Sequence, residues 1–423
     1  MTGCVAVVGA GQAGLQLATT LRTLGYDGRI VLVGAEPGLP YQRPPLSKGF
    51  LAGTVPHEEL ELRDPSLLAE QRIELHAGRR VVGAVLDRAG GLLRLDDGSE
   101  LAFDRLGLAT GATARRLPVP GADLPGMLTL RSVADAEQLR AGLADAADII
   151  VVGGGFVGLE VAATARAQGR RVTVVEAADR LLARVVAAPF SAHVRTWHEA
   201  RGTTVLTGAA VAGLTGTDRV TGVTLGDGRT LPADLVVAGV GASPVTSLAE
   251  ELGLDVERGI VTDVAGRTSH PRVVAVGDCT VQPHPHAPDR LLGIESVNNA
   301  VEQATAAAAV LLGHEPAPRG VPWFWSNQGD LRLQLVGISD GYDELVVRRG
   351  GSAGEGRLTV LYYRWGRLIA ADVAGNPRDF TAIRSALAEG RTLDPILAQD
   401  TDVPLRTLLT EARGLPADAA ARA

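Results

Sequence analysis

Lys48 is the residue whose type stands out before any motif is considered. The 423 residues include 41 lysines and arginines together, and Lys48 is the only lysine among them. Arginine carries a flat, permanently charged fork, whereas lysine carries a compact and movable ammonium. A lone lysine therefore indicates a site where a guanidinium is too bulky or too fixed, although chance survival accounts for the composition nearly as well. The surrounding run, Pro40-Tyr-Gln-Arg-Pro-Pro-Leu-Ser-Lys48, favours the functional interpretation.

A glycine turn suited to a dinucleotide lies near the start of the chain. The apolar run Cys4–Val8 leads into the turn Gly9-Ala-Gly11-Gln-Ala-Gly14, and apolar residues at helical spacing follow. In such a unit the first glycine permits the turn, the second lets the backbone approach a pyrophosphate, and the third lets helix and strand pack closely. The next apolar run ends near Glu36, whose carboxylate can accept hydrogen bonds from a ribose.

The same unit recurs in the middle of the chain. A strand-like run leads into Gly153-Gly-Gly155-Phe156-Val-Gly158, and the next strand ends at Glu176. One such motif is weak support, but two copies, each between a strand and a helix and each followed by an acid, predict two dinucleotide sites. A third run, Val273–Val276, ends in Gly277-Asp278 and offers a further carboxylate for sugar hydroxyls.

Glu176 also bears on the choice of cofactor. A carboxylate at this point binds the 2′-hydroxyl of NAD and repels the 2′-phosphate of NADP, so we expect NADH. Three arginines close in sequence could soften that preference: Arg170, Arg171 and Arg180.

Four segments resemble the NADH-dependent ferredoxin reductases, flavoproteins of the pyridine nucleotide-disulfide oxidoreductase superfamily. The enzymes in question serve bacterial haem-thiolate monooxygenases and ring-hydroxylating dioxygenases. The segments are Tyr41–Lys48, Gly154-Gly-Phe-Val-Gly-Leu-Glu160, Gly293–Gln303 and Trp323-Phe-Trp-Ser-Asn-Gln328. The likeness runs from about residue 4 to about residue 385.

The resemblance implies two cofactors, FAD and NADH, and a set of residues for each. Lys48 lies at the flavin ring, Glu160 faces Lys48, and Trp325 lies by the flavin where the partner docks, so these three are the expected catalytic residues. FAD is bound by Gly9, Gly11, Gly14, Glu36, Arg43, Lys48, Val82, Thr110, Gly111, Asp278, Glu295, Ser296, Val297 and Trp325. The nicotinamide dinucleotide is bound by Gly153, Gly155, Phe156, Gly158 and Glu176.

Two of these assignments have plain structural alternatives. An ordinary acid in the first turn of a helix, favoured by the helix dipole, also explains Glu160. Phe156 either covers the nicotinamide pocket or packs in the core.

Two positions depart from the family pattern. Asn327 replaces the usual aspartate of Trp-Ser-Asp, which removes a negative charge near the flavin entrance. Val245 replaces the asparagine of the family's Gly-x-x-Pro-Asn, in the run Gly241-Ala-Ser-Pro-Val245.

The cysteines exclude thiol chemistry. Disulfide reductases of this fold need a redox cysteine pair, and peroxide-handling relatives need one cysteine beside the flavin. Cys4 lies in the first strand and Cys279 follows Asp278, so both read as packing residues. The spacing Cys279-x₄-His284-x-His286 resembles a metal set, but three interleaved prolines predict a stiff surface loop and no metal site.

Bulk composition limits the class of protein and its partners. With 46% hydrophobic and 21% charged residues the chain is typical of a globular protein. Its net charge of −7 argues against nucleic acid as a partner. No signal peptide and no bilayer-spanning run are recognised, so we expect a cytoplasmic protein that does not bind membranes.

We therefore predict an α/β protein with two Rossmann-like dinucleotide-binding domains, each in three ββα layers, and a small C-terminal α+β domain. The FAD-binding domain comprises residues 1–112 and 244–320, and the NAD-binding domain comprises residues 113–243. Residues 321–423 form the C-terminal domain with a tail. Arginines 332, 348, 349, 364 and 367 either give this domain a basic face for the partner or form an ordinary solvated surface.

The predicted function is one-electron delivery from NADH, through FAD, to an iron–sulfur ferredoxin of the [2Fe–2S] type, by a monomer or weak homodimer. Two alternatives stay open. One is an NADH oxidase or diaphorase without a dedicated partner. The other is an NADH-sensing flavoprotein resembling apoptosis-inducing factor.

Overall fold

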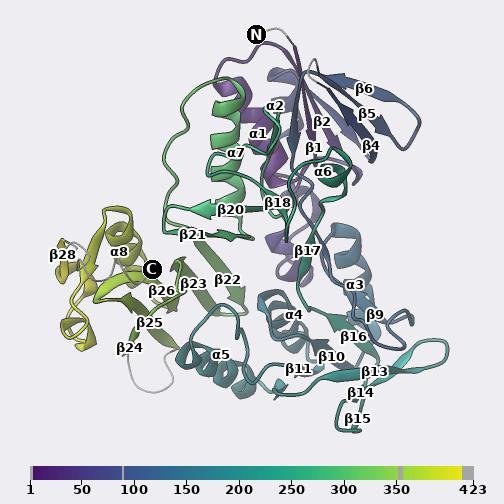
Figure 1. Cartoon of the computed structure of the whole chain (residues 1–423). Helices are drawn as coiled ribbons and strands as arrows, with labels where there is room; N and C mark the ends of the chain where they lie inside the picture. Colours follow the sequence, from purple (N-terminus) through teal and green to yellow (C-terminus); the bar gives the residue numbers. More distant parts are fainter. Residues whose placement is uncertain (1–2, 88–89, 351–355, 412–423) are drawn as a thin grey trace. The chain divides into compact units, whose positions relative to one another are not determined.

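The computed structural model describes residues 3–87, 90–350 and 356–411. The chain divides into two compact units, each containing a five-stranded parallel sheet (Figure 1). Unit 1 comprises Met1–Arg43, Val55–Thr113 and Ala242–Gly320. Unit 2 comprises Pro44–Thr54, Ala114–Gly241 and Val321–Ala423. Strands β8 (Ala112–Ala114) and β17 (Ala242–Pro244) pair where the chain passes between the units.

Unit 1 is built in three layers around the sheet β19-β7-β1-β2-β3. Strand β1 alternates between two cores, as the period of a strand requires. Val5 and Val7 pack with helices α1 and α7, which lie side by side in Figure 1. Ala6 and Val8 pack with the antiparallel sheet β4-β5-β6. The parallel sheet is therefore covered on both faces.

The bounds of the unit 1 elements are β1 Cys4–Val8, α1 Gln12–Thr23, β2 Arg29–Gly34, α2 Pro65–Glu70, β3 Ile73–Ala77, β4 Val81–Leu86, β5 Gly91–Leu95, β6 Glu100–Phe103, β7 Arg105–Leu108, α6 Ser247–Glu251, β18 Ile260–Val261, β19 Val273–Ala275, β20 Thr280–His284, β21 Ala287–Leu292 and α7 Val297–Leu311.

Unit 2 repeats the plan with the parallel sheet β12-β11-β10-β16-β9. Val151 in β10 faces a core shared with helices α3, α4 and α5, and Val152 faces the core of the antiparallel sheet β13-β14-β15. The first of these cores continues into the C-terminal sheet β22-β23-β26-β25-β24 through residues such as Leu333 and Tyr362. This continuity explains why the C-terminal part and the second nucleotide fold form one unit.

The bounds of the unit 2 elements are the 3-10 helix η1 Pro44–Ser47, β9 Met127–Thr129, α3 Val133–Asp145, β10 Asp148–Val152, α4 Phe156–Ala167, β11 Arg171–Val175, α5 Ala188–Ala200, β12 Thr204–Leu206, β13 Val211–Gly216, β14 Val220–Leu225, β15 Thr230–Pro232, β16 Leu235–Ala238, β22 Trp323–Gln328, β23 Leu331–Gly337, β24 Glu344–Gly350, β25 Arg357–Arg364, β26 Arg367–Ala374, α8 Pro377–Ala388, β27 Arg391–Leu393 and β28 Leu409–Glu411.

The predicted fold class is confirmed, down to the three ββα layers of each nucleotide fold and the small C-terminal α+β part. The three-domain division stays a proposal, and the contacts place Pro44–Thr54 in unit 2. The predicted tail falls largely on residues 412–423, which lie outside the described residues.

The prediction of a surface loop after Cys279 is wrong. Thr280–His284 is strand β20, which lies between β18 and β21, and His284 is buried. The pairing with β21 shifts register between Gln282 and His284, around Pro283. This irregularity lets the strand accommodate a residue that has no N–H to donate.

Neither a membrane helix nor a metal cluster is found in the part of the chain that the structure describes. None of its helices is long and apolar enough to cross a bilayer. No group of three or more His, Cys, Asp or Glu side chains there could hold a metal ion.

Candidate functional site

The first glycine turn leaves the start of α1 open to an anion. A Cβ on Gly14 would lie 1.8 Å from the carbonyl oxygen of Gly9, so this position admits glycine alone. A Cβ on Gly11 would meet nothing within 4 Å, which leaves room for a ligand against the backbone. Among the described residues no side chain caps α1, and its first turn holds no acid. The unsatisfied N–H groups and the helix dipole together suit a pyrophosphate.

Polar side chains that follow β2 in unit 1 gather into one charged group near Asp278. Arg43 Nη2 lies 2.5 Å from Glu36 Oε1, and the hydroxyl of Tyr41 donates to the other oxygen of Glu36. Burial opposes the charge of Arg43, but Tyr41, Glu36 and Asp278 outweigh it and raise the pKa of this guanidinium. A half-buried, permanently cationic guanidinium adds to the attraction of unit 1 for phosphate.

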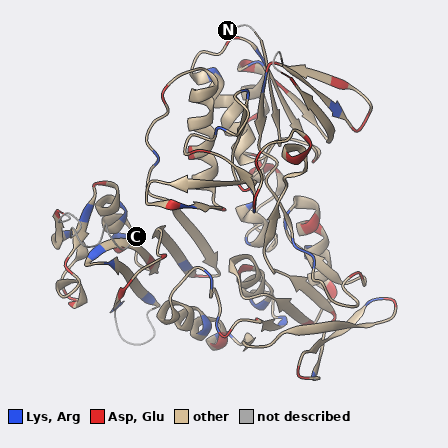
Figure 2. Cartoon of the chain, in the orientation of Figure 1, with Lys and Arg blue, Asp and Glu red and all other residues tan. Residues whose placement is uncertain are grey.

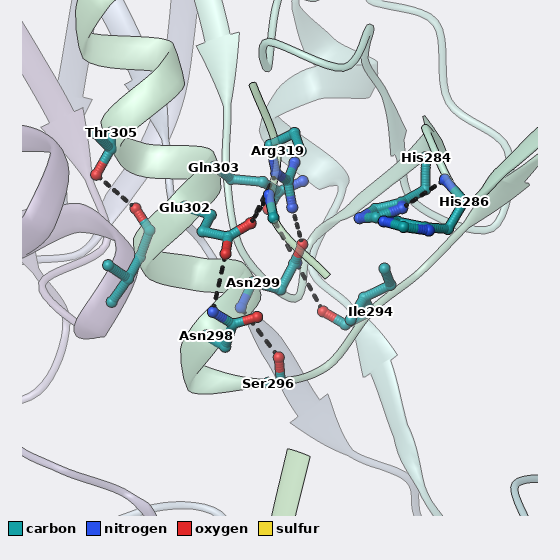
Figure 3. Close-up of polar contacts among 12 residues, drawn as sticks. His284, His286, Ile294, Ser296, Asn298, Asn299, Glu302, Gln303, Thr305 and Arg319 are labelled. Atoms are coloured by element: carbon teal, nitrogen blue, oxygen red, sulfur yellow. Dashed lines mark hydrogen bonds and ion pairs between the residues drawn. The ribbon is translucent and has the colours of Figure 1, made fainter. Parts of the chain in front are cut away.

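The Gly277–Asp278 turn is held in place by helix α7. The N–H of Gly277 donates to Oε1 of Gln303 at 2.6 Å, and Gln303 Nε2 donates to Thr280 Oγ1 at 2.8 Å. Figure 3 shows the first turns of α7, where Ser296 Oγ caps the N–H of Asn299 and the Asn299 amide donates to the carbonyl of Ile294. These bonds fix Asp278 and the segment before α7 on one scaffold.

The other predicted FAD residues of unit 1 lie in several places. Thr110 donates from Oγ1 to the carbonyl of Val245 at 2.7 Å, and Val245 N–H donates to the carbonyl of Gly111 at 2.9 Å. Val245 therefore keeps a backbone role despite its departure from the family pattern. Glu295 is exposed just before the α7 cap, and Val297 begins the helix. Val82 lies on β4 with an exposed fraction of 47%.

The second glycine turn, in unit 2, has the same open character. Within the described residues α4 begins after Gly155 without a side-chain cap, and a Cβ on Gly155 would meet only the Gly239 carbonyl oxygen, at 3.8 Å. A Cβ on Gly158 would lie 2.5 Å from the carbonyl oxygen of Gly153, so close packing again requires glycine. The Glu176 carboxylate accepts hydrogen bonds from the Gly154 N–H at 2.5 Å and from the Ala178 N–H at 2.8 Å.

The three arginines near Glu176 have partners of their own. Arg171 pairs with Asp148 at 2.5 Å, Arg180 donates to the carbonyls of Ala183 and Val186, and Arg170 donates to the carbonyl of Ala144. None of these contacts involves Glu176, so they give no support to a softened cofactor preference.

Lys48 and Glu160 form a buried ion pair within unit 2. Lys48 Nζ lies 2.7 Å from Glu160 Oε2 and donates to the carbonyl of Pro44 at 2.9 Å. The exposed fractions of the two side chains are 20% and 4%. The hydroxyl of Ser47 donates to the same oxygen of Glu160. Thr164, one turn further along α4, donates to the carbonyl of Ser47 at 3.1 Å, which ties η1 to this helix.

The first-turn explanation of Glu160 is wrong. Helix α4 begins at Phe156 and its first turn holds no acid, so Glu160 lies beyond the reach of the helix end. Its carboxylate is held instead by side chains from η1 and from β22.

Strand β22 places Ser326 and Trp325 on opposite faces, and the Ser326 side chain contacts Glu160. Ser326 is fully buried and donates to Glu160 Oε1 at 2.6 Å. Trp325, one residue earlier, points to the opposite face of the strand, where its ring lies 5.4 Å from that of Trp323. Asn327 shares the face of Trp325 and is exposed. The structure therefore brings Ser326 to the ion pair and leaves Trp325 on the other side of the strand.

Sequence reasoning missed the buried polar face of β22. Ser326 and Gln328 stand two residues apart in a strand and are both fully buried. Their alternation with Trp325 and Asn327 was a usable signal, because buried polar side chains need partners. Phe156 lies on this side too, with its ring 4.7 Å from that of Phe324, and packs at the edge of the unit 2 core.

Both cysteines are unsuited to thiol chemistry. Cys279 is fully buried, and its Sγ contacts the carbonyl of Val276 at 3.3 Å. Desolvation raises the pKa of Cys279 and of the partly buried Cys4, so each stays a thiol.

One of the five arginines suggested for a basic face of the C-terminal part, Arg348, does not lie on the surface. Arg348 is buried and donates to the carbonyls of Asp400 and Val403 at 2.7 and 2.8 Å. Figure 2 shows positive positions scattered through both units, with negative ones among them.

Known proteins match the chain along almost its whole length. The family described as pyridine nucleotide-disulphide oxidoreductase matches residues 4–304, and that described as reductase C-terminal matches residues 323–409. Rhodocoxin reductase of Rhodococcus erythropolis is 41% identical, with 99% of this chain and 97% of the relative covered. The ferredoxin–NAD(+) reductase component of the biphenyl dioxygenase system of Paraburkholderia xenovorans is 37% identical, with 97% and 99% covered.

A solved structure agrees with these sequences. The reductase in the covalent putidaredoxin reductase–putidaredoxin complex superposes with a TM-score of 0.91 at 40% identity, covering 100% of this chain and 99% of that one. The resemblance to ferredoxin reductases drawn from the sequence is thereby confirmed. The chain belongs to the pyridine nucleotide-disulphide oxidoreductase family.

Proposed function

We propose that this protein is an FAD-containing reductase that transfers electrons from NADH, one at a time, to an iron–sulfur ferredoxin. The ferredoxin in turn serves a haem-thiolate monooxygenase or a ring-hydroxylating dioxygenase. The observation that carries the proposal is the full-length similarity to reductases of such systems, C-terminal part included.

The cysteines separate this activity from the disulfide chemistry of the family name. The chain contains two cysteines, and both lie in unit 1, one in β1 and one buried behind Asp278. Neither has a partner cysteine or the lowered pKa that a reactive thiol needs. Electrons must therefore leave the protein to an external acceptor.

The residues present fit the two cofactors. The uncapped start of α1, the open space at Gly11 and the charged group around Arg43 suit the pyrophosphate of FAD. The uncapped start of α4 and the open space at Gly155 suit the pyrophosphate of NADH. The Glu176 carboxylate beside the second turn favours a 2′-hydroxyl over a 2′-phosphate, so NADH is the proposed donor.

When bound, FAD supplies the chemistry of accepting a hydride and releasing single electrons. The protein supplies the charge and the orientation. We assign to Lys48 the role of a fixed positive charge at the flavin, and to Glu160 the role of holding that ammonium in place. Trp325, Phe156, Val82 and the segment Glu295–Val297 stay predicted cofactor contacts. The [2Fe–2S] type of the partner, the cytoplasmic location and the monomeric or weakly dimeric state are likewise proposals.

A ferredoxin titration tests this function. Purified protein with bound FAD is supplied with NADH and cytochrome c, and candidate [2Fe–2S] ferredoxins are added in increasing amounts. We expect cytochrome c reduction to rise with ferredoxin and to saturate. Oxygen uptake at a rate that does not change when ferredoxin is added would instead identify an NADH oxidase. Slow flavin reduction with a long-lived NAD complex would identify a sensor.

A further inference from the structure

A row of buried polar side chains leads from helix α5 to the Lys48–Glu160 pair, entirely within unit 2. His198 Nε2 lies 2.8 Å from Gln328 Oε1, and Gln328 Nε2 lies 3.4 Å from Ser326 Oγ. Ser326 Oγ lies 2.6 Å from Glu160 Oε1. His198, Gln328 and Ser326 are each fully buried. A buried polar side chain without a hydrogen-bond partner costs free energy on desolvation, so each of these three side chains depends on its neighbour. Packing alone does not explain why three such side chains follow one another.

The direction of every hydrogen bond in this row follows from the charge of Glu160. An ionised carboxylate only accepts, so the Ser326 hydroxyl must donate to it. The serine oxygen then accepts from the Gln328 amide nitrogen, which turns the amide oxygen toward His198. Burial lowers the pKa of His198, so the ring is neutral at neutral pH and its single N–H lies on Nε2. All donors therefore point toward Glu160.

We propose that Gln328 and His198 are positioning residues for Lys48. They hold the Ser326 hydroxyl in the rotamer that donates to Glu160, so that one carboxylate oxygen is satisfied by Ser326 and the other stays directed at Lys48 and Ser47. The role in flavin reduction rests on the proposed function, whereas the effect on the Lys48 ammonium does not.

Removal of the Gln328 amide has a defined consequence. The Ser326 hydroxyl then has no donor behind it and is free to rotate, and Glu160 Oε1 loses its partner in a buried setting. The carboxylate reorients, and the Lys48 ammonium shifts with it.

Because Lys48 is the only lysine in the chain, a change in the environment of its ammonium can be measured without an enzymatic assay. Protein grown on lysine labelled with ¹⁵N at Nζ has one labelled ammonium, that of Lys48, because the chain contains no other lysine. We expect one ¹⁵Nζ signal with slow hydrogen exchange in the wild type. Gln328→Met, of similar volume, is expected to shift that signal and to speed its exchange severalfold.

Three further variants separate hydrogen bonding from packing. His198→Leu removes the N–H and is expected to act as Gln328→Met does. His198→Gln replaces the ring N–H with an amide N–H and is expected to restore the wild-type signal. Gln138→Met, at an exposed position of α3, is the matched control and is expected to change nothing.

Stopped-flow reduction by NADH provides the functional readout. We expect Gln328→Met and His198→Leu to lower the limiting rate constant about tenfold, as for the loss of one charge-assisted hydrogen bond, with little change in the Kd for NADH. A ¹⁵Nζ signal identical to wild type in both variants would overturn the proposal. So would a shifted signal that His198→Gln fails to restore. If wild-type protein does not reduce any ferredoxin, the proposed function fails, and the ¹⁵Nζ comparison still decides whether the row positions Lys48.

Discussion

At the scale of single residues, the most informative feature is the Lys48–Glu160 ion pair, which fixes the position of the Lys48 charge. An ion pair that is largely buried is weak support for stability, since desolvation of the two charges offsets much of their attraction. Two hydroxyl groups and one ammonium nevertheless converge on one carboxylate, from Ser47 at the end of η1, the adjacent Lys48, and Ser326 in β22. Such convergence is expected where the position of a charge matters for chemistry.

Lys48→Arg tests the shape of this charge. A guanidinium has a different reach and a planar set of donors, so it does not reproduce the contacts with Glu160 and the Pro44 carbonyl. We expect FAD content to stay at the wild-type level and reduction by NADH, followed by stopped-flow absorbance, to slow about tenfold or more. Lys48→Met serves as the companion that removes charge altogether. Wild-type rates in Lys48→Arg would refute the assigned role.

Glu176→Ala tests the preference for NADH. Loss of the carboxylate removes both the acceptor for a ribose hydroxyl and the repulsion of a 2′-phosphate. The ratio of kcat/KM for NADH to that for NADPH, measured with ferricyanide as acceptor, is expected to fall about tenfold or more. Glu137→Ala, at an exposed position of α3, is the control for loss of one negative charge. An unchanged ratio would show that Glu176 does not set the preference for NADH over NADPH.

At the scale of elements, the helices that follow the two glycine turns differ from most of their neighbours. Side chains cap α2, α3, α7 and α8, through Asp64, Ser132, Ser296 and Asn376. Helices α1 and α4 start after glycine with no such cap among the described residues. Their first N–H groups are left for a ligand, and this costs the apo protein some helix stability.

Gly11→Ala and Gly155→Ala form a reciprocal pair of variants. Neither position has positive φ, and the added methyl group meets at most one atom within 4 Å, so both proteins are expected to fold normally. Gly11→Ala is expected to lower FAD content severalfold. Gly155→Ala is expected to retain FAD and to raise the Kd for NADH about tenfold.

Each variant of this pair is the control for the other. FAD content is measured by absorbance and NADH binding by titration of the flavin-loaded protein. Gly14→Ala, which would place its Cβ 1.8 Å from the Gly9 carbonyl oxygen, is expected to lose the fold. Equal effects of Gly11→Ala and Gly155→Ala on both cofactors would contradict the assignment of one turn to each.

At the scale of the whole molecule, a buried polar pair joins the C-terminal sheet to the second nucleotide fold within unit 2. The Tyr362 hydroxyl donates to Asp372 and accepts from the Ala187 N–H at the start of α5, at 2.8 Å. Desolvation raises the pKa of Asp372 to about 7, against the lowering effects of Tyr362 and Ala187. The acid therefore holds its proton in the folded protein to a higher pH than in the unfolded chain.

This shift predicts a pH dependence of stability with a definite sign. Between the unfolded pKa of 3.8 and about 7, the unfolded chain binds fewer protons at Asp372 than the folded protein does, so stability falls as pH rises. The fall is at most about 1.4 kcal/mol per pH unit. Asp372→Asn keeps an acceptor for Tyr362 and does not titrate.

Urea unfolding between pH 4.5 and pH 7.5 measures this effect. The free energy of unfolding of Asp372→Asn minus that of wild type is expected to increase as pH rises through that window, because only the wild type loses stability. Groups such as His284, whose pKa burial lowers to about 4, act equally in both proteins and cancel in the difference. Parallel profiles for the two proteins would show that Asp372 ionises normally.

The two glycine turns, with the strand before and the helix after each, were predictable from the sequence. Cys4–Val8 had to be a buried strand and Gly9–Gly14 a tight turn, because apolar runs and glycine spacing act over a few neighbouring residues. Helix α8 follows from a pattern of the same kind, because Phe380, Ile383 and Leu387 recur at helical spacing and are buried. Pro283 misled the prediction of β20, because a shift of register accommodates a proline only when the partner strand is known.

The sequence by itself determined which residue types were available and which local turns they form, since these depend on short-range sterics and periodicity. Only the tertiary structure decided that Ser326, and not Trp325, reaches Glu160, and that His198 stands behind Gln328. Glu160 and Ser326 lie 166 positions apart in the chain. Which face of β22 packs on α4 depends on the whole core of unit 2, and no local pattern encodes that choice.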